Sequence, residues 1–123
     1  MVVKRCLDTY VLMELYYGNQ KFLTYSNADV VIPDPTLAEF FGVLLRNHGK
    51  TEAMTWFKKL ARYAVSVDKE TLRDAVEFRQ ANKKKRISFF DAVGYIYALK
   101  KGMAFVTGDK EFKDIKGVEF MKK

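Results

Sequence analysis

Short runs of β-branched and apolar residues alternate with helical segments along the chain, and this alternation limits the possible folds more than any other feature of the sequence. Five such runs, over residues 2–7, 29–32, 63–67, 103–107 and 118–121, predict strands. Helical segments separate most of them. The sequence therefore predicts an α/β fold with a mostly parallel sheet and helices on both of its faces.

Residues typical of helix ends mark the helical segments. Thr9 and Asp68 fit N-cap positions. Asp34 fits a third N-cap, because Pro35 follows it at the first helical position. No linker or internal repeat divides the 123 residues, which predicts one domain over residues 1–123. Helices are expected over residues 10–17, 21–25, 35–48, 51–62, 69–82 and 88–101.

The chain carries 22 Lys and Arg residues against 15 Asp and Glu residues, a net charge of +7. This excess favours an anionic partner, which could be RNA, DNA, an acidic protein or an acidic surface. The single cysteine, Cys6, excludes an intrachain disulfide and fits a buried position in a protein of the reducing cytosol. The longest uninterrupted apolar run, residues 40–45, is far shorter than the roughly 20 residues of a membrane span. We therefore expect a cytoplasmic protein with no membrane association.

Common nucleotide-binding and zinc-binding motifs are missing from the sequence. Gly49-Lys50-Thr51 ends like a phosphate-binding P-loop, but Leu44 stands where that motif needs a glycine. No glycine-rich dinucleotide motif follows the first expected strand, and no cluster of Cys and His fits zinc. The only histidine, His48, falls in an expected turn, where a solvated side chain is the simplest interpretation. The acidic residues therefore remain the best candidates for chemistry.

Two acids come at the ends of expected strands. Asp8 directly follows the first strand, and Asp109 follows the fourth after Gly108. Open α/β sheets bind ligands at the carboxyl ends of their strands, so both acids are candidate site residues. Asp8 could equally be a turn acid that caps the next helix, and Asp109 could belong to an ordinary Gly-Asp turn.

Asp91 is the only acid of an expected helix that is apolar on nearly all sides over residues 89–99. An isolated buried charge is costly, so this carboxylate should be paired, protonated or bound to a metal, unless it caps the helix together with Ser88. Glu39 lies opposite the apolar stripe of its helix, and alone it would be solvated. Carboxylates that share a site need a neutralising cation, and an all-oxygen site suits Mg²⁺ or Mn²⁺. A basic protein with such a site fits a metal-dependent nuclease.

The acids and their neighbours, taken in order, resemble the PIN domain, and most closely the VapC-type ribonuclease toxins of toxin–antitoxin pairs. The resemblance covers nearly the whole chain and depends on the ordered set of four short segments rather than on any one of them. These segments are Cys6-Leu7-Asp8-Thr9, Leu37-Ala38-Glu39-Phe40, Ser88-Phe89-Phe90-Asp91-Ala92 and Thr107-Gly108-Asp109-Lys110.

The resemblance implies a fold, an activity and partners. The fold is a three-layer α/β/α domain with a mostly parallel sheet in the strand order 3-2-1-4-5. The activity is that of an endoribonuclease that needs Mg²⁺ or Mn²⁺ and hydrolyses RNA in single strands or loops. The implied partners are an RNA substrate, a second copy of the chain in a homodimer, and a small antitoxin protein that holds the toxin inactive.

The resemblance also assigns roles to individual residues. Asp8, Asp91 and Asp109 are the implied metal ligands. Glu39 completes the set of catalytic acids and is expected to act through water. Thr107 and Thr9 are expected to support these acids with their hydroxyl groups.

Three further positions affect this assignment. Tyr10 stands where many relatives have a small or amide residue after Asp-Thr, so a local hydrogen bond near the metal is expected to be missing. Gly108 stands where relatives often carry a polar residue. Asp114 is close enough in sequence to Asp109 to be an alternative ligand, although Asp109 is the preferred one.

The basic residues Lys110, Lys83, Lys84, Lys85 and Arg86 are candidate contacts for RNA phosphates, although the run of four could simply be a solvated loop. The aromatic residues Tyr16, Tyr17 and Trp56 could stack on bases, but packing in the core or a dimer interface is favoured. Two other functions stay open. One is a catalytically silent PIN-like module that binds RNA or protein, and the other is a housekeeping PIN nuclease without an antitoxin.

Overall fold

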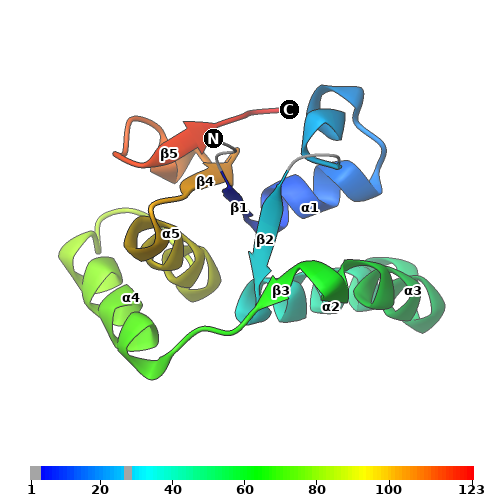
Figure 1. The fold of residues 1–123 in the computed structure, drawn as a ribbon, viewed down its shortest axis with the longest axis horizontal. Helices are drawn as coiled ribbons and strands as arrows, with labels where there is room; N and C mark the ends of the chain where they lie inside the picture. Colours follow the sequence, from blue (N-terminus) through cyan, green and yellow to red (C-terminus); the bar gives the residue numbers. More distant parts are fainter. Residues whose placement is uncertain (1–3, 27–28) are drawn as a thin grey trace.

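The computed structural model describes residues 4–26 and 29–123, and its centre is a parallel sheet of five strands in the order β3-β2-β1-β4-β5 (Figure 1). All four neighbouring pairs are parallel, which confirms the predicted class and strand order. Residues 2 and 3 of the first expected strand lie outside the described residues. The strands are β1 (Arg5–Leu7), β2 (Val30–Pro33), β3 (Ala64–Val65), β4 (Ala104–Thr107) and β5 (Val118–Phe120).

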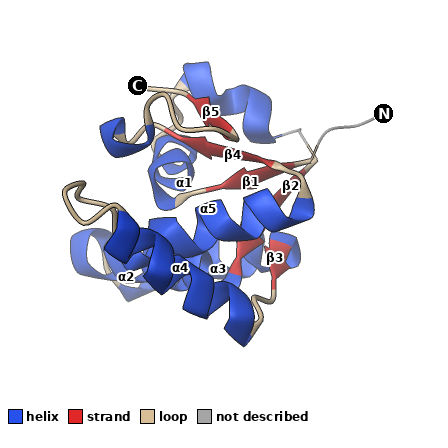
Figure 2. Cartoon of the chain, turned by 90° about the vertical axis from the view of Figure 1, so that its left-hand side faces the viewer, coloured by secondary structure: helices blue, strands red, loops and turns tan. Residues whose placement is uncertain are grey.

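Helices cover both faces of the sheet, as predicted. Figure 1 shows α4 and α5 on one side of the strands and α1 and α3 on the other, and Figure 2 shows α5 lying along the strands. The α-helices are α1 (Thr9–Tyr16), α2 (Asp34–His48), α3 (Lys50–Leu60), α4 (Lys69–Ala81) and α5 (Phe89–Lys101). The short 3₁₀ segments are η1 (Gln20–Ser26), η2 (Ala61–Tyr63) and η3 (Lys110–Phe112).

Two predicted helix starts are wrong by one residue. Asp8, not Thr9, is the N-cap of α1, since its side chain accepts a hydrogen bond from the Val11 amide. Pro33 occupies the N-cap position of α2, and Asp34 is already helical with no side-chain cap bond. At α1 two good capping residues stand side by side, and the end of β1 decides between them.

Alternate residues of the central strands face two separate hydrophobic clusters. Leu7 and Val106 pack with α1, α2, η1 and α3, whereas Cys6 and Phe105 pack with α4, α5 and η3. This period of two is the pattern expected for strands covered on both faces. Cys6 is fully buried, which agrees with its interpretation as a small core residue, and burial raises the pKa of its thiol.

Helix α5 lies close to the sheet because Gly94 has no side chain. The Cys6 Sγ atom is 3.7 Å from the Gly94 carbonyl oxygen, and a Cβ at Gly94 would stand 2.8 Å from Cε1 of Phe105. Six of the 13 residues of α5 are buried, in keeping with its apolar sequence, but Leu99 is exposed. This close approach fixes the N-terminal end of α5 beside the carboxyl ends of β1 and β4.

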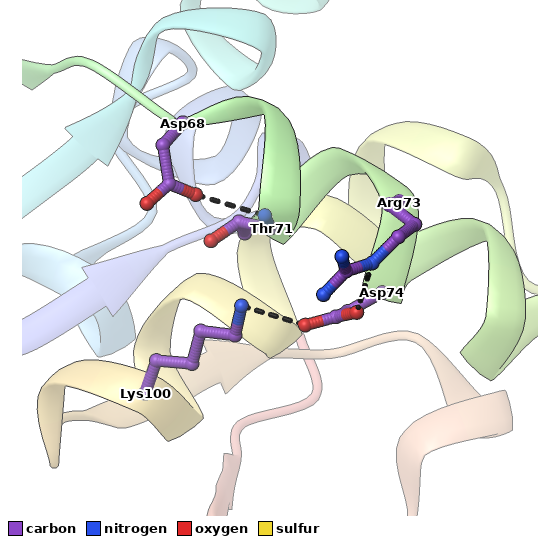
Figure 3. A network of polar contacts seen from close by, with 5 residues as sticks. All are labelled: Asp68, Thr71, Arg73, Asp74 and Lys100. Carbon is purple, nitrogen blue, oxygen red and sulfur yellow. Dashed lines mark hydrogen bonds and ion pairs between the residues drawn. The ribbon is translucent and has the colours of Figure 1, made fainter.

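Polar contacts join α4 to α5 on the outer surface of that layer (Figure 3). Asp68 caps α4 by accepting a hydrogen bond from the Thr71 amide at 2.8 Å, as predicted. The Asp74 carboxylate pairs with Lys100 Nζ at 2.7 Å and with Arg73 Nε at 3.0 Å. Within residues 4–26 and 29–123, no helix has the length and apolar character that crossing a membrane requires.

Candidate active site

Four acids from four separate elements line one pocket of about 540 Å³ at the carboxyl edge of the sheet. Asp8 follows β1, Glu39 comes from α2, Asp91 comes from α5, and Asp109 follows β4. We call this the acid pocket. It brings together the four carboxylates that the sequence nominated. A second pocket of about 600 Å³, between η1 and α3, is lined mainly by apolar side chains and by no acid of the described chain.

Asp8 forms the floor of the acid pocket and is only 1% exposed. Its Oδ1 atom accepts the hydrogen bond from the Val11 amide at 3.0 Å that caps α1. Its Oδ2 atom is buried and has no hydrogen-bond partner among the described residues. Burial, followed by the charge of Asp91, raises the pKa of Asp8 well above its usual range, and Thr107 and the Val11 amide offset only part of this effect. An unpartnered buried carboxylate oxygen indicates a place for a cation or a proton.

Asp91 is held in the first turn of α5. Its amide donates to Ser88 Oγ at 3.0 Å, so Ser88 caps the helix while the Asp91 carboxylate lines the pocket. Burial and the charges of Glu39 and Asp109 raise the pKa of Asp91 to about 7. The two interpretations of this segment, as a helix cap and as part of a site, are therefore compatible. Ser88 caps the helix, and the Asp91 carboxylate is free to face the other acids.

Hydroxyl groups hold the remaining two acids. The Thr9 hydroxyl donates to the Glu39 carboxylate, which ties the first turn of α1 to α2. The Asp109 amide donates to the fully buried Thr107 hydroxyl at 3.0 Å, and Asp109 Oδ1 accepts from the Glu111 amide at 3.0 Å. These bonds fix the turn between β4 and η3 that carries Asp109.

The predicted basic residues take two different positions. Lys110 lines the acid pocket next to Asp109. The run over residues 83–86 is an exposed loop outside the pocket lining, and it contacts η3 through Glu111. Lys85 Nζ donates to the Glu111 carbonyl at 3.3 Å, and the Arg86 amide donates to the Glu111 carboxylate at 2.9 Å.

Several other nominated side chains lie outside the acid pocket. Asp114 is exposed, has a φ of 66°, and does not line the pocket. Tyr16 and Trp56 pack against each other with ring centroids 5.2 Å apart, at the edge of the core beside α1 and α3. His48 is exposed, but it is the last residue of α2 rather than part of a turn, and its Nε2 atom lies 3.0 Å from the Tyr17 hydroxyl.

The pocket also contains residues that the sequence did not nominate for substrate contact. Tyr10, Lys122 and Lys123 complete its lining together with Ser88 and Gly108. The two lysines follow β5, and only the position of β5 next to β4 brings them to this edge of the sheet. Strand order combined with the positive charge after the last strand was the signal that could have found them.

The donor set of the pocket fits a hard divalent cation. In the described part of the chain, no group of three or more acid, histidine or cysteine side chains lies close enough together to hold a metal ion. The unpartnered Oδ2 of Asp8 and the raised pKa values of Asp8 and Asp91 nevertheless indicate that the protein alone does not compensate the negative charge of the ionised carboxylates. Carboxylate oxygens without nitrogen or sulfur ligands suit Mg²⁺ or Mn²⁺.

Comparison with known protein families identifies the family of this chain. The family model of the PIN domain matches residues 5–118, so the chain belongs to the PIN domain family. No curated protein matches the sequence significantly.

Solved structures share the fold at low sequence identity. The VapC20 toxin of Mycobacterium tuberculosis, described as cleaving the sarcin-ricin loop, superposes with a TM-score of 0.82 and 20% identity, covering 97% of this chain and 99% of that one. DNA-bound VapBC from Salmonella typhimurium gives a TM-score of 0.77 and 18% identity, covering 98% of both chains. A toxin–antitoxin complex from Klebsiella pneumoniae gives 0.74 and 18%, covering 97% of this chain and 99% of that one.

Proposed function

We propose that this protein is an Mg²⁺- or Mn²⁺-dependent endoribonuclease and the toxin of a VapBC-type toxin–antitoxin pair, acting in the cytoplasm. The observation that carries the proposal is the convergence of four acids on one pocket, with a buried carboxylate oxygen of Asp8 left unpartnered at its floor. A pure RNA-binding protein has no physical reason to gather carboxylates where a polyanion must approach, because like charges repel.

In this proposal Asp8, Asp91 and Asp109 hold the metal, and Glu39 contributes through water. When bound there, the ion would supply a water of lowered pKa and would neutralise charge on the phosphodiester. Each acid has a defined support, and that of Asp91 is the Ser88 hydroxyl, which accepts a hydrogen bond from the Asp91 amide. The Val11 amide orients Asp8, Thr107 and the Glu111 amide orient Asp109, and the Thr9 hydroxyl orients Glu39.

RNA and an antitoxin are the proposed partners. Support comes from the net charge of +7, from Lys110 at the pocket, and from the structural relatives, one described as a sarcin-ricin-loop-cleaving toxin, one as a toxin–antitoxin complex and one as DNA-bound VapBC. A homodimer is proposed from the resemblance to VapC-type toxins. The phosphates of RNA would contact the basic residues while the acids hold the ion.

The test is cleavage of labelled RNA by the purified chain with Mg²⁺, with Mn²⁺ and with EDTA. We expect cleavage with either ion, none with EDTA, and a loss of at least about a hundredfold in Asp8→Asn and Asp91→Asn. Asp114→Asn makes the same chemical change on an exposed acid outside the pocket and should retain activity. Unchanged cleavage in both pocket variants would contradict the four-acid site.

Two further outcomes separate the alternative functions. RNA binding without cleavage in any metal would favour a catalytically silent module. Cleavage by a protein that neither arrests growth on expression nor co-purifies with a small partner would favour a housekeeping nuclease without an antitoxin.

A further inference from the structure

Residues 121–123, here called the final segment, are tied to the rim of the acid pocket. The Met121 amide donates to the Thr107 carbonyl at 2.8 Å, which continues the β4–β5 pairing beyond β5. The Lys123 amide donates to the Tyr10 hydroxyl at 3.0 Å. The final segment is therefore anchored both to the strand that precedes Asp109 and to the first turn of α1.

Charged side chains add two more ties. Lys21 Nζ donates to the Lys122 carbonyl oxygen. Lys123 Nζ lies 3.9 Å from Oε2 of Glu14, a nearly buried acid of α1 whose other oxygen accepts from Asn19 Nδ2 at 2.9 Å. The ammonium group of Lys123 therefore has an acidic neighbour in the protein, although its side chain is 64% exposed.

The path of the final segment depends on the two positions that depart from the family pattern. A Cβ at residue 108 would stand 2.1 Å from Cε1 of Tyr10 and 2.6 Å from the Met121 carbonyl oxygen. Only glycine leaves room for the Tyr10 ring and the Met121 backbone at this point. Gly108 and Tyr10 are therefore complementary. The absence of a side chain at Gly108 leaves room for the Tyr10 ring, and the Tyr10 hydroxyl accepts the hydrogen bond from the Lys123 amide.

This arrangement places three lysines at the acid pocket. Lys110, Lys122 and Lys123 line it together with the four acids. Among the described residues, Lys110 and Lys122 form no ion pair, whereas Lys123 has Glu14. An exposed ammonium without a protein partner beside a site for phosphodiesters is suited to bind a phosphate oxygen as a point charge.

We propose that Lys122 is an RNA-phosphate-binding residue of the acid pocket, paired in this role with Lys110 and positioned by the contacts of Tyr10 with Gly108 and Lys123. The proposal rests on the proposed ribonuclease function and adds a substrate contact to it. Lys122 needs no metal for this contact. Its contribution is therefore measurable as RNA affinity independently of catalysis.

The test compares Lys122→Ala with Lys116→Ala, which removes the same charge from an exposed lysine on the loop before β5, outside the pocket lining. Binding of a fluorescent oligouridylate is measured in EDTA over a range of salt concentrations. We expect Lys122→Ala to weaken binding about three- to tenfold at low salt and to reduce the slope of log K against log salt by about 0.7, the value for one lost phosphate contact on a single strand. Lys122→Arg should restore the affinity.

Steady-state cleavage of RNA provides the second measurement. Lys122→Ala should raise KM while kcat changes little, and Tyr10→Phe, which loses the bond to the Lys123 amide, should give a smaller change in the same direction. Equal affinity, salt slope and KM in Lys122→Ala and Lys116→Ala would overturn the proposal. If the wild-type chain cleaves no RNA, the ribonuclease function fails, and the metal-free salt slope still decides whether Lys122 contacts phosphate.

Discussion

The charge of Asp91, in the first turn of α5, raises the pKa of the buried Asp8 carboxyl at the end of β1. The two residues are far apart in sequence and come from different elements, the end of β1 and the start of α5. Their repulsion is a cost of holding the site together, and a bound cation or a proton removes it.

This cost predicts a pH dependence of stability in the absence of divalent ions. The folded protein keeps the Asp91 proton up to about pH 7, whereas the unfolded chain releases it near an ordinary aspartate pKa of about 4. Between these values the folded state binds more protons, so the free energy of unfolding falls as the pH rises. Asp8 acts in the same direction. We expect Asp91→Asn to flatten this decline by on the order of 1–3 kcal/mol, measured by urea unfolding in EDTA. Parallel pH curves for the variant and the wild type would contradict the expectation.

Divalent ions should stabilise the folded protein at neutral pH. Mg²⁺ or Mn²⁺ that binds the acid pocket only in the folded state raises Tm, because the stabilisation grows with the logarithm of one plus the ratio of the free ion concentration to Kd. The increase should be lost in Asp8→Asn, in which the amide oxygen can still accept the capping bond from the Val11 amide. Thermal unfolding with increasing metal provides the measurement, and Asp114→Asn is the matched control. An undiminished Tm increase in Asp8→Asn would place the ion elsewhere.

Gly108→Ala should destabilise the domain. The new Cβ would clash with the Tyr10 ring and with the Met121 carbonyl oxygen, and the second contact is backbone that cannot rotate away. We expect a loss of about 1–3 kcal/mol in the free energy of unfolding. Gly42→Ala, a substitution within α2 where a Cβ meets nothing within 4 Å, should instead be neutral or stabilising by about 0.5–1 kcal/mol. Equal stability of the two variants would show that the approach of Tyr10 to residue 108 is not required.

Thr107 should matter through its hydroxyl rather than its size. Thr107→Val keeps the shape but leaves the Asp109 amide without its acceptor, at a cost of about 1–3 kcal/mol. Cleavage should fall as well, because the turn that carries Asp109 loses its anchor. Thr107→Ser retains the oxygen and should recover most of the activity while losing some packing. Single-turnover rates of the two variants separate these effects, and similar losses in both would point to packing alone.

Sequence patterns predicted the sheet and most helices because they depend on local chemistry. Leu7 and Cys6 alternate between two cores, Asp68 and Ser88 stand where helices begin, and Gly102 stands where α5 ends. The choice of Asp8 over Thr9 as the cap of α1 was not local, since it depends on where β1 stops.

The residues of the acid pocket show more clearly that non-local structure cannot be predicted from local sequence patterns. Asp8 and Asp109 were found because they follow strands, but the local pattern around Glu39 fits an ordinary surface acid, so only the family resemblance nominated it; the structure places it beside Thr9 in the pocket. Lys122 carries no local signal at all. Its position depends on the pairing of β5 with β4 and on the space that Gly108 leaves for Tyr10.

The four acids of the pocket depend on both hydrophobic clusters, which lie on opposite faces of the sheet. Asp8 caps α1 and Glu39 belongs to α2, and both helices pack into one cluster, whereas Asp91 belongs to α5 and Asp109 caps η3, and both of these pack into the other cluster. A partly folded chain with only one layer in place would therefore hold two of the four carboxylates. The complete set exists only when both layers are assembled, so we expect any state that opens one side of the sheet to lose the four-acid pocket.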